Sequence, residues 1–532
     1  MKNGSYEHIW HSDDSERNDS LERARDCAAL TKPWVLVPKD QEPDAKLPQP
    51  YSSLGARGMT NLEGATVLAI FPTDMPWIVL EPAAEQKFDL RADPEVIQRV
   101  QDLLYYQTLI LLSKLEAAGV DKGQSYRQQS GFRSRKRMSI SQCFITGDTL
   151  ERLTDDYRIQ VYGRAGYVTK RSCEGDVLYH GIREKIDLLT LTDNQLVRAK
   201  LDPDEVKNKP REERWMFMYT FPEWQPRGRN WTIKQEVHNE VIVESQEEVS
   251  PFFCTPFSLS AGENYGRGFV EQNLGDFTSF DTIREKMLDF AAACSRIHPV
   301  LDPSCQIKNE DFDKPSGAVF RARVEGGVIQ NAAFLKVDKL NDFNVVYQTG
   351  ETLRRDLGQS MLLENEVAPS GEAGRSPVAW QTIVGQLDKA LGGVYSEIAD
   401  NQQTPMVRRA MYQLQRDNLI LPLPMKSIEI KLLSGINALS RGQKVIRINA
   451  FVEQVRNLLG DQAVAELNMS TIVGILARMN GIDEPGIVKT PEQKAAEQQQ
   501  AEAQAARMAV MEKGVDTAGN VIEAQATAAP AA

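Results

Sequence analysis

Two stretches of the chain place apolar residues at alternating intervals of three and four. After Phe277 these residues are Phe280, Ile283, Met287, Phe290, Cys294 and Ile297. The second stretch repeats the spacing with Phe343, Val346, Gly350, Leu353, Leu357 and Met361. Such spacing lays a narrow apolar seam along one side of an α-helix and leaves its other sides polar. We therefore predict amphipathic helices at residues 269–298 and 343–363, each of which needs a partner along its length.

Residues 299–342, between these predicted helices, follow a different pattern. Short extended runs, such as Gly317–Val324 and Val328–Val337, alternate there with proline and glycine. Periodicity alone is typical of an ordinary helical hairpin at the edge of a globular domain. The β-rich insert favours another interpretation, in which a stalk of paired helices carries a small β-rich tip.

The region before the paired helices mixes both periodicities. Between Arg158 and Val243, short runs of period two predict antiparallel strands with one wet face. A helix is predicted from Asp93 and Pro94, which suit the N-cap and the first helical position. The small and apolar residues that lead to Pro72 predict a helix packed tightly against a neighbour and stopped by that proline. Together these elements predict an α+β protein.

The C-terminal part is predicted to be helical. A long helix follows from Val378, and the pair Gly392 and Gly393 predicts a kink within it. Another helical region follows Arg441. Residues 493–532 are rich in Gln and Ala and predict a fraying helix that passes into disorder.

Composition places the chain among soluble, folded proteins. It has 532 residues, 41% hydrophobic and 26% charged. The polar start of the chain lacks the apolar core of a signal peptide, and a short helix at Ser20–Leu30 followed by prolines indicates an arm. No stretch reaches the roughly 20 apolar residues that a membrane span needs. The cysteines form no CxxC pair, which is typical of free thiols in a reducing compartment and argues against structural zinc.

The formal net charge of −12 argues against a protein that grips nucleic acid electrostatically. It is compatible with a protein that must touch DNA without holding it, because an acidic wall repels phosphate. The one dense basic run, Arg133–Arg137, could meet phosphate, but a solvated face or a contact between subunits explains it better.

The usual catalytic signatures are missing. Neither GxxxxGK[ST] nor GxGxxG occurs. The run Gly123–Arg127 lacks the second glycine of a nucleophile elbow and is expected to be a plain loop. His238 and Glu240 have the H-x-E spacing of zinc deaminases, but no PCxxC supplies further ligands. Asp311 and Asp313 begin like a calcium loop that the following residues do not complete.

Several short runs of the sequence together resemble one protein family. The runs Gly55–Leu62 and Leu68–Pro72 resemble the N-terminal signature of the head-to-tail connecting, or portal, proteins of short-tailed, podovirus-type double-stranded DNA bacteriophages. Further segments resemble the same family in the same order along the chain: Gly262–Arg267, Leu274–Asp276, Leu391–Ser396, Ser434–Gln443 and Asn480–Asp483. The similarity spans nearly the whole chain.

The resemblance implies a portal fold that assembles as a dodecameric ring. Its parts are an N-terminal arm (1–50), a mixed α/β wing (51–268 and 378–448, the second part with the long kinked helix), stem helices (269–298 and 343–363), a β-rich clip (299–342), a tunnel loop (364–377), a helical crown (449–490) and a flexible tail (491–532). It also implies that the apolar seams of the stem helices find their partners in neighbouring subunits.

The implied function is that of a portal at one capsid vertex of the virion, assembled in the host cytoplasm. Such a ring nucleates procapsid assembly and conducts double-stranded DNA during genome packaging and ejection. The implied partners are the major capsid protein, the scaffolding protein, the terminase large subunit and then tail adaptor and tail tube proteins. The resemblance implies no catalytic residue, cofactor, metal or membrane contact.

Acidic residues of the stem and tunnel loop are predicted to face the DNA channel, with one arginine as a phosphate contact: Asp281, Glu285, Asp289, Glu364, Glu366, Glu372 and Arg375. Clip charges are predicted from position to meet the motor or the tail: Lys308, Asp311, Asp313 and Lys314. For each residue, a solvated surface charge is the alternative.

Two rival classes of function stay open. One is a metal-dependent nuclease or hydrolase with a dispersed carboxylate site such as Asp202, Asp204 and Glu205, for which a short acidic loop is the simpler explanation. The other is a helical scaffold or tail-adaptor protein without a DNA channel. Metal-dependent turnover would identify the first, and the absence of a ring with a central bore the second.

Overall fold

A computed structural model of the chain describes residues 5–42, 44–72, 76–83, 94–117, 131–208, 212–225, 228–295, 298–301, 324–325, 328–329, 332–335, 340–363, 385, 387, 391, 394–432 and 450–457. The chain divides into two compact units, Met1–Leu439 and Ser440–Ala532. In the second unit, the described residues 450–457 are helical. The helices and antiparallel strands of the first unit confirm an α+β protein.

A five-stranded antiparallel sheet is built where period-two runs predict strands. In spatial order its strands are β4 (Tyr167–Arg171), β5 (Val177–Asp187), β6 (Glu213–Gln225), β7 (Gly228–Val237) and β8 (Glu240–Glu247). Small elements border it: the 3-10 turns η2 (Arg164–Gly166) and η3 (Leu188–Thr190), and the helices α7 (Asp193–Arg198) and α8 (Pro203–Asn208). Leu196 of α7 is buried with Met216 and Val237 of the sheet, which closes a small core there.

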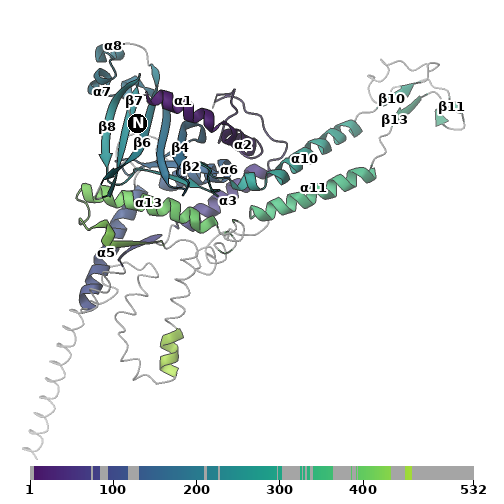
Figure 1. The fold of residues 1–532 in the computed structure, drawn as a ribbon. Coiled ribbons are helices and arrows are strands. Elements are labelled where there is room, and N and C mark those ends of the chain that lie inside the picture. The colour runs from purple at the N-terminus through teal and green to yellow at the C-terminus, as the bar shows by residue number, and fades with distance from the viewer. Residues whose placement is uncertain are drawn as a thin grey trace, which may run out of the picture. The chain divides into compact units, whose positions relative to one another are not determined.

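Helix α1 (Tyr6–Glu16) lies on this sheet (Figure 1). The rings of Tyr6 and Tyr219 stack with centroids 5.0 Å apart, and Trp10 is fully buried beside Phe217. Glu236 Oε2 accepts the Tyr6 backbone N–H at 2.9 Å, which satisfies a donor that the first turn leaves free. The sequence analysis missed α1 because its mixed charges give no seam, whereas α2 (Asn18–Ala29) lies where a helix is predicted.

A second layer of the molecule consists of a smaller sheet and three helices. It contains the three-stranded sheet β3-β2-β9, formed by β3 (Ile159–Tyr162), β2 (Asp148–Leu153) and β9 (Phe252–Pro256). The helices α3 (Leu54–Ile70), α6 (Phe132–Thr146) and α9 (Phe269–Gln272) share the main hydrophobic core with it. Lys136 of α6 and Glu151 of β2 form an ion pair of 2.6 Å in this core, with both side chains 0% exposed.

Segments far apart in the sequence meet beside this core. Strand β1 (Ile78–Pro82) pairs antiparallel with β14 (Ile428–Leu432), which follows the 3-10 turn η6 (Met425–Ser427). Helix α5 (Pro94–Ala117) begins at the predicted proline and contacts β1. Helix α13 (Val394–Arg416) packs on β9, β14 and α5. The predicted kink at Gly392 and Gly393 lies outside the described residues.

Helices α10 (Leu274–Ser295) and α11 (Leu340–Ser360) lie side by side and lead away from the sheets toward β10 and β13 (Figure 1). The insert between them forms the antiparallel pairs β10 (His298–Leu301) with β13 (Ala332–Leu335) and β11 (Val324–Glu325) with β12 (Val328–Ile329). The continuous helix predicted from residue 269 is wrong at one point. Asn273 separates α9 from α10, because its side chain donates to Phe269 O at 2.9 Å and its backbone leaves the helical region.

Candidate functional site

We call α10 and α11 the stem pair. The rings of Phe290 and Phe343 stack across it with centroids 4.9 Å apart. A Cβ on Gly350 would lie 3.2 Å from Ile283 Cγ2, so the two helices approach closely at that level. Leu357 is buried at the end of α11. The two seams therefore meet within one chain but stay partly exposed, with Val346 37% exposed, so the expectation that neighbouring copies cover them stays a prediction.

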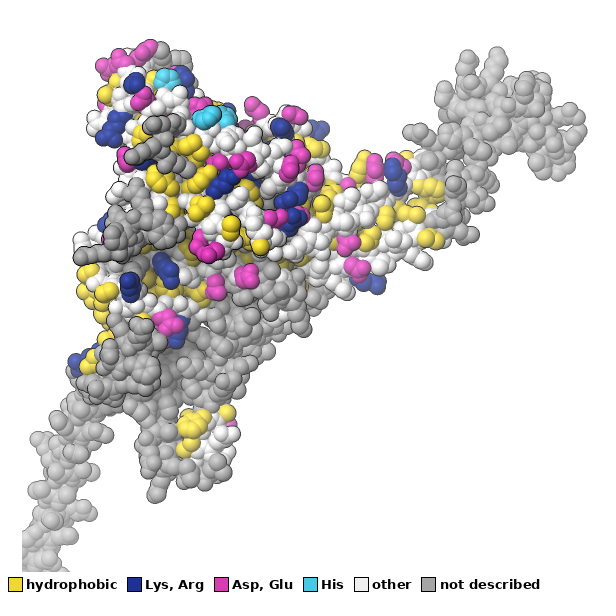
Figure 2. All heavy atoms as spheres, viewed as in Figure 1, with side chains coloured by type: hydrophobic (Ala, Val, Ile, Leu, Met, Phe, Trp, Pro, Cys, Tyr) yellow, Lys and Arg dark blue, Asp and Glu magenta, His cyan; other side chains and the backbone are white. Residues whose placement is uncertain are grey.

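Other apolar residues of the stem pair lie off the seam and are exposed. Leu288 on α10 is 49% exposed, and Val345 and Tyr347 on α11 are 64% and 48% exposed. Hydrophobic, acidic and basic side chains all reach the surface of the stem pair in Figure 2. Single exposed apolar residues are common, but an isolated pair of helices has no other core to cover them.

The sequence motif at residues 55–62 lies in α3 and holds the end of α11. A Cβ on Gly58 would lie 2.1 Å from Met361 Sδ, so any larger residue must displace that side chain. Asn61 Nδ2 donates to the carbonyls of Met361 at 3.2 Å and Leu362 at 3.0 Å. Carbonyls at a helix C-terminus lack partners inside the helix, so Asn61 acts as a cap for α11. The motif thus fixes the place where the stem pair joins the body.

Two of the predicted channel carboxylates hold the segment that precedes α3. Asp281 Oδ1 accepts the Ser52 backbone N–H at 3.0 Å, and Glu285 Oε1 accepts the Tyr51 hydroxyl at 3.0 Å. The hydrogen bond to Glu285 raises the pKa of Tyr51. Asp289, the third predicted carboxylate of the stem, lies 3.3 Å from Lys286 Nζ. These contacts leave their orientation toward a channel a prediction.

A groove lies where the stem pair meets residues 51–57, with a cavity volume of about 320 Å³. Most of its lining surface is polar, and its apolar part, which we call the floor, is formed by Phe280, Ile283 and Met287. Its rim is cationic and carries Arg57, Arg284 and Arg354, together with Tyr51, Tyr347 and Glu351. Arg354 Nε donates to Glu351 at 2.9 Å. Within the described part of the chain, no ion pair is recorded for Arg57 or Arg284.

The segment Gly262–Arg267, which enters the stem, is fixed by polar contacts. Arg267 pairs with Glu263 at 2.7 Å and with Glu271 at 2.9 Å, and its hydrogen bond lowers the pKa of Glu263. The Tyr265 hydroxyl accepts the Thr169 backbone N–H at 3.0 Å, which ties the segment to the five-stranded sheet.

Glycines let this segment pass close to the end of α6. Gly147 has φ 85, a backbone conformation that side chains rarely adopt. A Cβ on Gly266 would lie 2.5 Å from Gly147 O. Gly266 of the motif is therefore required by backbone approach, and nothing in these contacts indicates catalysis.

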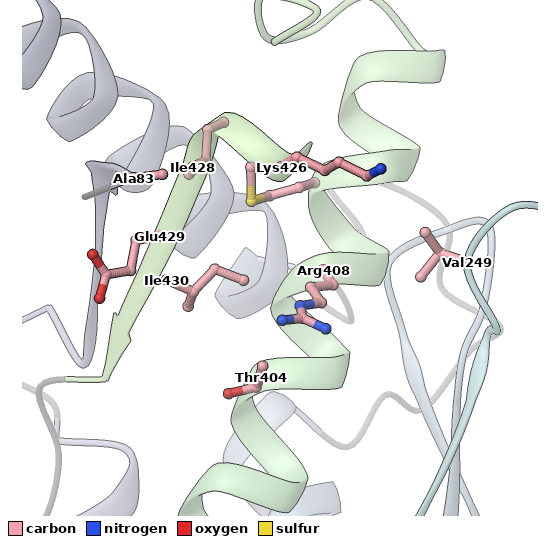
Figure 3. A pocket seen from close by; sticks show the side chains of 9 residues that line it. Ala83, Val249, Thr404, Arg408, Lys426, Ile428, Glu429 and Ile430 are labelled. Atoms are coloured by element: carbon pink, nitrogen blue, oxygen red, sulfur yellow. The ribbon is translucent and has the colours of Figure 1, made fainter. Parts of the chain in front are cut away.

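A second hollow lies between α13 and β14 (Figure 3), with a cavity volume of about 560 Å³. Ile430 extends toward α13, and Glu429 extends from the opposite side of the strand. The charged residues around it are Arg408, Lys426 and Glu429. Its described lining contains no histidine, no cysteine and no pair of carboxylates.

The residues considered for metal or nuclease chemistry have structural roles. His238 and Asn239 form the turn between β7 and β8 with φ 55 and 62, and Glu240 pairs with Lys200. Asp202 Oδ1 accepts the Asp204 backbone N–H at 3.0 Å at the start of α8, as an N-cap does. No group of three or more His, Cys, Asp or Glu in the described residues could hold a metal ion.

Three basic residues of the run 133–137 have acceptors within the chain. Arg133 donates to Pro72 O at 2.9 Å, Lys136 pairs with buried Glu151, and Arg137 lies 3.9 Å from Glu63. The contact between subunits considered for this run is therefore not needed to explain it. Sequence alone could not show these acceptors, because they lie elsewhere along the chain.

The buried nucleophilic and basic groups are not poised for reaction. Burial raises the pKa of the Cys27 thiol to about 12 and lowers the pKa of His180 to about 3. The thiolate is the reactive form of cysteine, so a raised pKa makes Cys27 inert. Among the described helices, none is long and apolar enough to cross a membrane.

Several predicted site residues lie outside the described residues. These are the loop residues Glu364, Glu366, Glu372 and Arg375, and the clip residues Lys308, Asp311, Asp313 and Lys314. The run Gly123–Arg127 also lies outside them. The arginines of the groove are residues that the sequence analysis missed. A signal was present, because Arg284 and Arg354 each directly follow a seam residue, Ile283 and Leu353.

Comparisons with known proteins agree on one family. Residues 144–488 match the family described as bacteriophage head to tail connecting protein. The portal protein of Escherichia phage T7 is 26% identical over 520 residues, covering 96% of this chain and 92% of that protein. The portal protein of Enterobacteria phage T3 is 24% identical over 519 residues, with the same coverage. That of Enterobacteria phage SP6 is 22% identical over 451 residues, covering 84% of this chain and 82% of that protein.

Among solved structures, a chain in the neck of an empty GTA particle aligns with a TM-score of 0.36 and 11% sequence identity. The alignment covers 77% of this chain and 90% of that chain.

Proposed function

This chain belongs to the family of bacteriophage head to tail connecting proteins, and from that membership we propose that it forms a dodecameric portal ring at one vertex of the phage capsid. The ring nucleates procapsid assembly and conducts double-stranded DNA during packaging and ejection. It docks the terminase large subunit first and the tail adaptor and tail tube proteins later. It contacts the major capsid and scaffolding proteins and acts without catalysis of its own.

The observation that carries this proposal is the stem pair. Its two seams meet within the chain but stay partly exposed, and Leu288, Val345 and Tyr347 are exposed around them. In a closed ring, one side of each stem pair faces the opposite side of the next, and such heterologous contacts cover these residues. The relatives that match over most of this chain are portal proteins, which supports the same assembly.

The proposed channel wall is acidic. DNA must slide without stalling, and negative side chains weaken its binding because they repel phosphate. We assign Asp281, Glu285 and Asp289 of the stem to this wall, together with the predicted tunnel loop. Asp289 is the most available of the three, since its side chain is 66% exposed, while the other two also hold residues 51 and 52.

Negative-stain electron microscopy of the purified full chain tests the ring. We expect class averages of about twelve subunits, in line with the family, around a central opening wide enough for a duplex. A compact monomer or dimer at every protein and salt concentration contradicts the proposal.

Charge reversal tests the channel wall. Changing Glu364 and Glu366 to lysine is expected to slow packaging and make its rate depend more steeply on salt, because lysine binds phosphate. An unchanged rate and salt dependence in rings of normal appearance removes these residues from the channel.

A separate variant, K308E/D311K, tests the clip. If it binds both terminase and the first tail protein normally, the assignment of these clip charges to partner contacts is wrong.

A further inference from the structure

The groove at the root of the stem pair combines features that suit a protein segment. Phe280, Ile283 and Met287 give it an apolar floor, and Arg284 and Arg354 stand on its rim. The rim thus carries positive charge although the chain as a whole has a formal net charge of −12. Apolar floors with cationic rims suit ligands that bring both an apolar side chain and a carboxylate.

A matching stripe lies on the other side of the same stem pair. Val345, Thr349, Thr352 and Asp356 follow one another along α11 at intervals of four, three and four, and all are exposed. At 100° per residue, this stripe is rotated by about 160° from the groove residues Tyr347, Glu351 and Arg354. The groove and the stripe therefore occupy opposite sides of one helix pair.

The stripe is more apolar than its sequence indicates. Thr349 Oγ1 donates to Val345 O at 2.9 Å, and Thr352 Oγ1 donates to Gln348 O at 3.0 Å. Both hydroxyls are thus used within α11, which leaves the threonine methyl groups as free surface. Val345 is 64% exposed. Among the described residues, no ion pair is recorded for Asp356 at the end of the stripe.

Resting on the proposed ring, we propose that the groove of one copy receives the Val345–Asp356 stripe of a second copy. Val345 and the methyl groups of Thr349 and Thr352 cover the apolar floor, and Asp356 binds the arginines of the rim. Rotation about a ring axis keeps each residue at its own height. Groove and stripe involve the same turns of α11, residues 347–354 and 345–356, so neighbouring copies bring them to the same level.

DNA is the competing occupant, because arginines also bind phosphate. Phosphate contacts use arginine, lysine and backbone N–H groups, and a floor of Phe280, Ile283 and Met287 gives a phosphate nothing to bind. A second copy accounts for both the floor and the rim.

The test is a charge swap in the full chain, with ring formation followed by mass photometry over a range of protein concentrations. The variant R284E/R354E places carboxylates against Asp356, so we expect at least a tenfold rise in the concentration at which half of the chains are in rings. Adding D356R restores opposite charges, and we expect rings to return. R355E is the matched control, because Arg355 is the exposed neighbour of Arg354 outside the groove lining.

The outcomes separate this contact from the proposed function. If the wild type forms rings and R284E/R354E assembles equally well, the contact alone is overturned. The contact is also overturned if adding D356R does not restore rings, provided that circular dichroism shows all variants to be equally helical. Normal assembly of R284E/R354E with weakened, salt-dependent binding of a DNA duplex assigns the groove to phosphate instead. A wild-type chain that stays monomeric overturns the proposed ring and the contact with it.

Discussion

Phe217 of the five-stranded sheet is 4% exposed under α1, whereas Leu288 of the stem pair is 49% exposed. The same contrast holds for charge. Glu236 of the sheet caps α1, while Arg284 and Asp356 of the stem pair have no ion-pair partner among the described residues. Beneath α1 the sheet therefore completes its contacts within one chain, although Trp215 and Val241 elsewhere on it are 43% and 41% exposed. The stem pair has only a partly covered seam and exposed outer sides, which indicates that its contacts depend more on assembly than those beneath α1 do.

This comparison predicts that substitutions in the sheet region change the stability of a single chain. Substitutions on the outer sides of the stem pair should change assembly instead.

The largest effect is expected from the buried pair of Lys136 and Glu151. K136M removes the partner of a carboxylate that is 0% exposed, and an unpaired buried charge costs about 3–5 kcal/mol of unfolding free energy. Urea unfolding of the dissociated chain, followed by circular dichroism, measures this loss. The double variant K136M/E151L should recover most of it, since an apolar pair leaves no charge. K136M with wild-type stability contradicts a self-contained body.

An intermediate effect is expected from His180, again in the sheet. Burial lowers its folded pKa to about 3, and the nearby Arg171 acts in the same direction. An unfolded histidine titrates near 6.5, so between about pH 6.5 and 3 the unfolded chain binds a proton that the folded chain does not. Stability is therefore fully present above that range and falls as the pH falls through it, by about 2 kcal/mol at pH 5.

Unfolding at pH 7 and pH 5 measures this loss in the wild type and two variants. H180N should lose less stability between the two values, because asparagine does not titrate. H238N is the control, since His238 lies exposed in a turn, and it should keep the wild-type loss. An equal loss in H180N and the wild type contradicts the assignment to His180.

The smallest effect is expected where the two regions join. G58A adds a Cβ 2.1 Å from Met361 Sδ, and overpacking of this size costs about 1 kcal/mol. Gly64 in the same helix has nothing within 4 Å of an added Cβ, so G64A should stabilise the chain by up to about 1 kcal/mol through helix propensity. Thermal unfolding that gives both variants the same sign contradicts a close contact between α3 and the end of α11.

Local patterns allowed much of this fold to be predicted from the sequence. The 3-4 spacing located the stem pair, Pro94 located the start of α5, and period two located the antiparallel sheet. Each of these signals acts within a few residues. Helix α1 was not predicted because tertiary contacts with Tyr219 and Phe217 stabilise it. The break at Asn273 was not predicted because it depends on one side-chain hydrogen bond.

The candidate site was predictable only in part, for a related reason. Asp281 and Glu285 stand out by charge, but their partners Ser52 and Tyr51 are more than 200 residues away, and no local pattern links them. The motif at residues 55–62 identified the family before its physical role was visible. That role, the close approach of Gly58 and the cap from Asn61, depends on a helix that begins only at Leu340.

Hydrogen–deuterium exchange of dissociated and assembled protein tests the central contrast most directly. If only neighbouring copies cover the outer sides of the stem pair, the amides of Leu274–Ser295 and Leu340–Ser360 should exchange quickly in the dissociated chain. They should gain strong protection from exchange on assembly. The five-stranded sheet should exchange at nearly the same rate in both states. Equal protection of the stem pair in both states, or a larger gain in the sheet, would contradict the account.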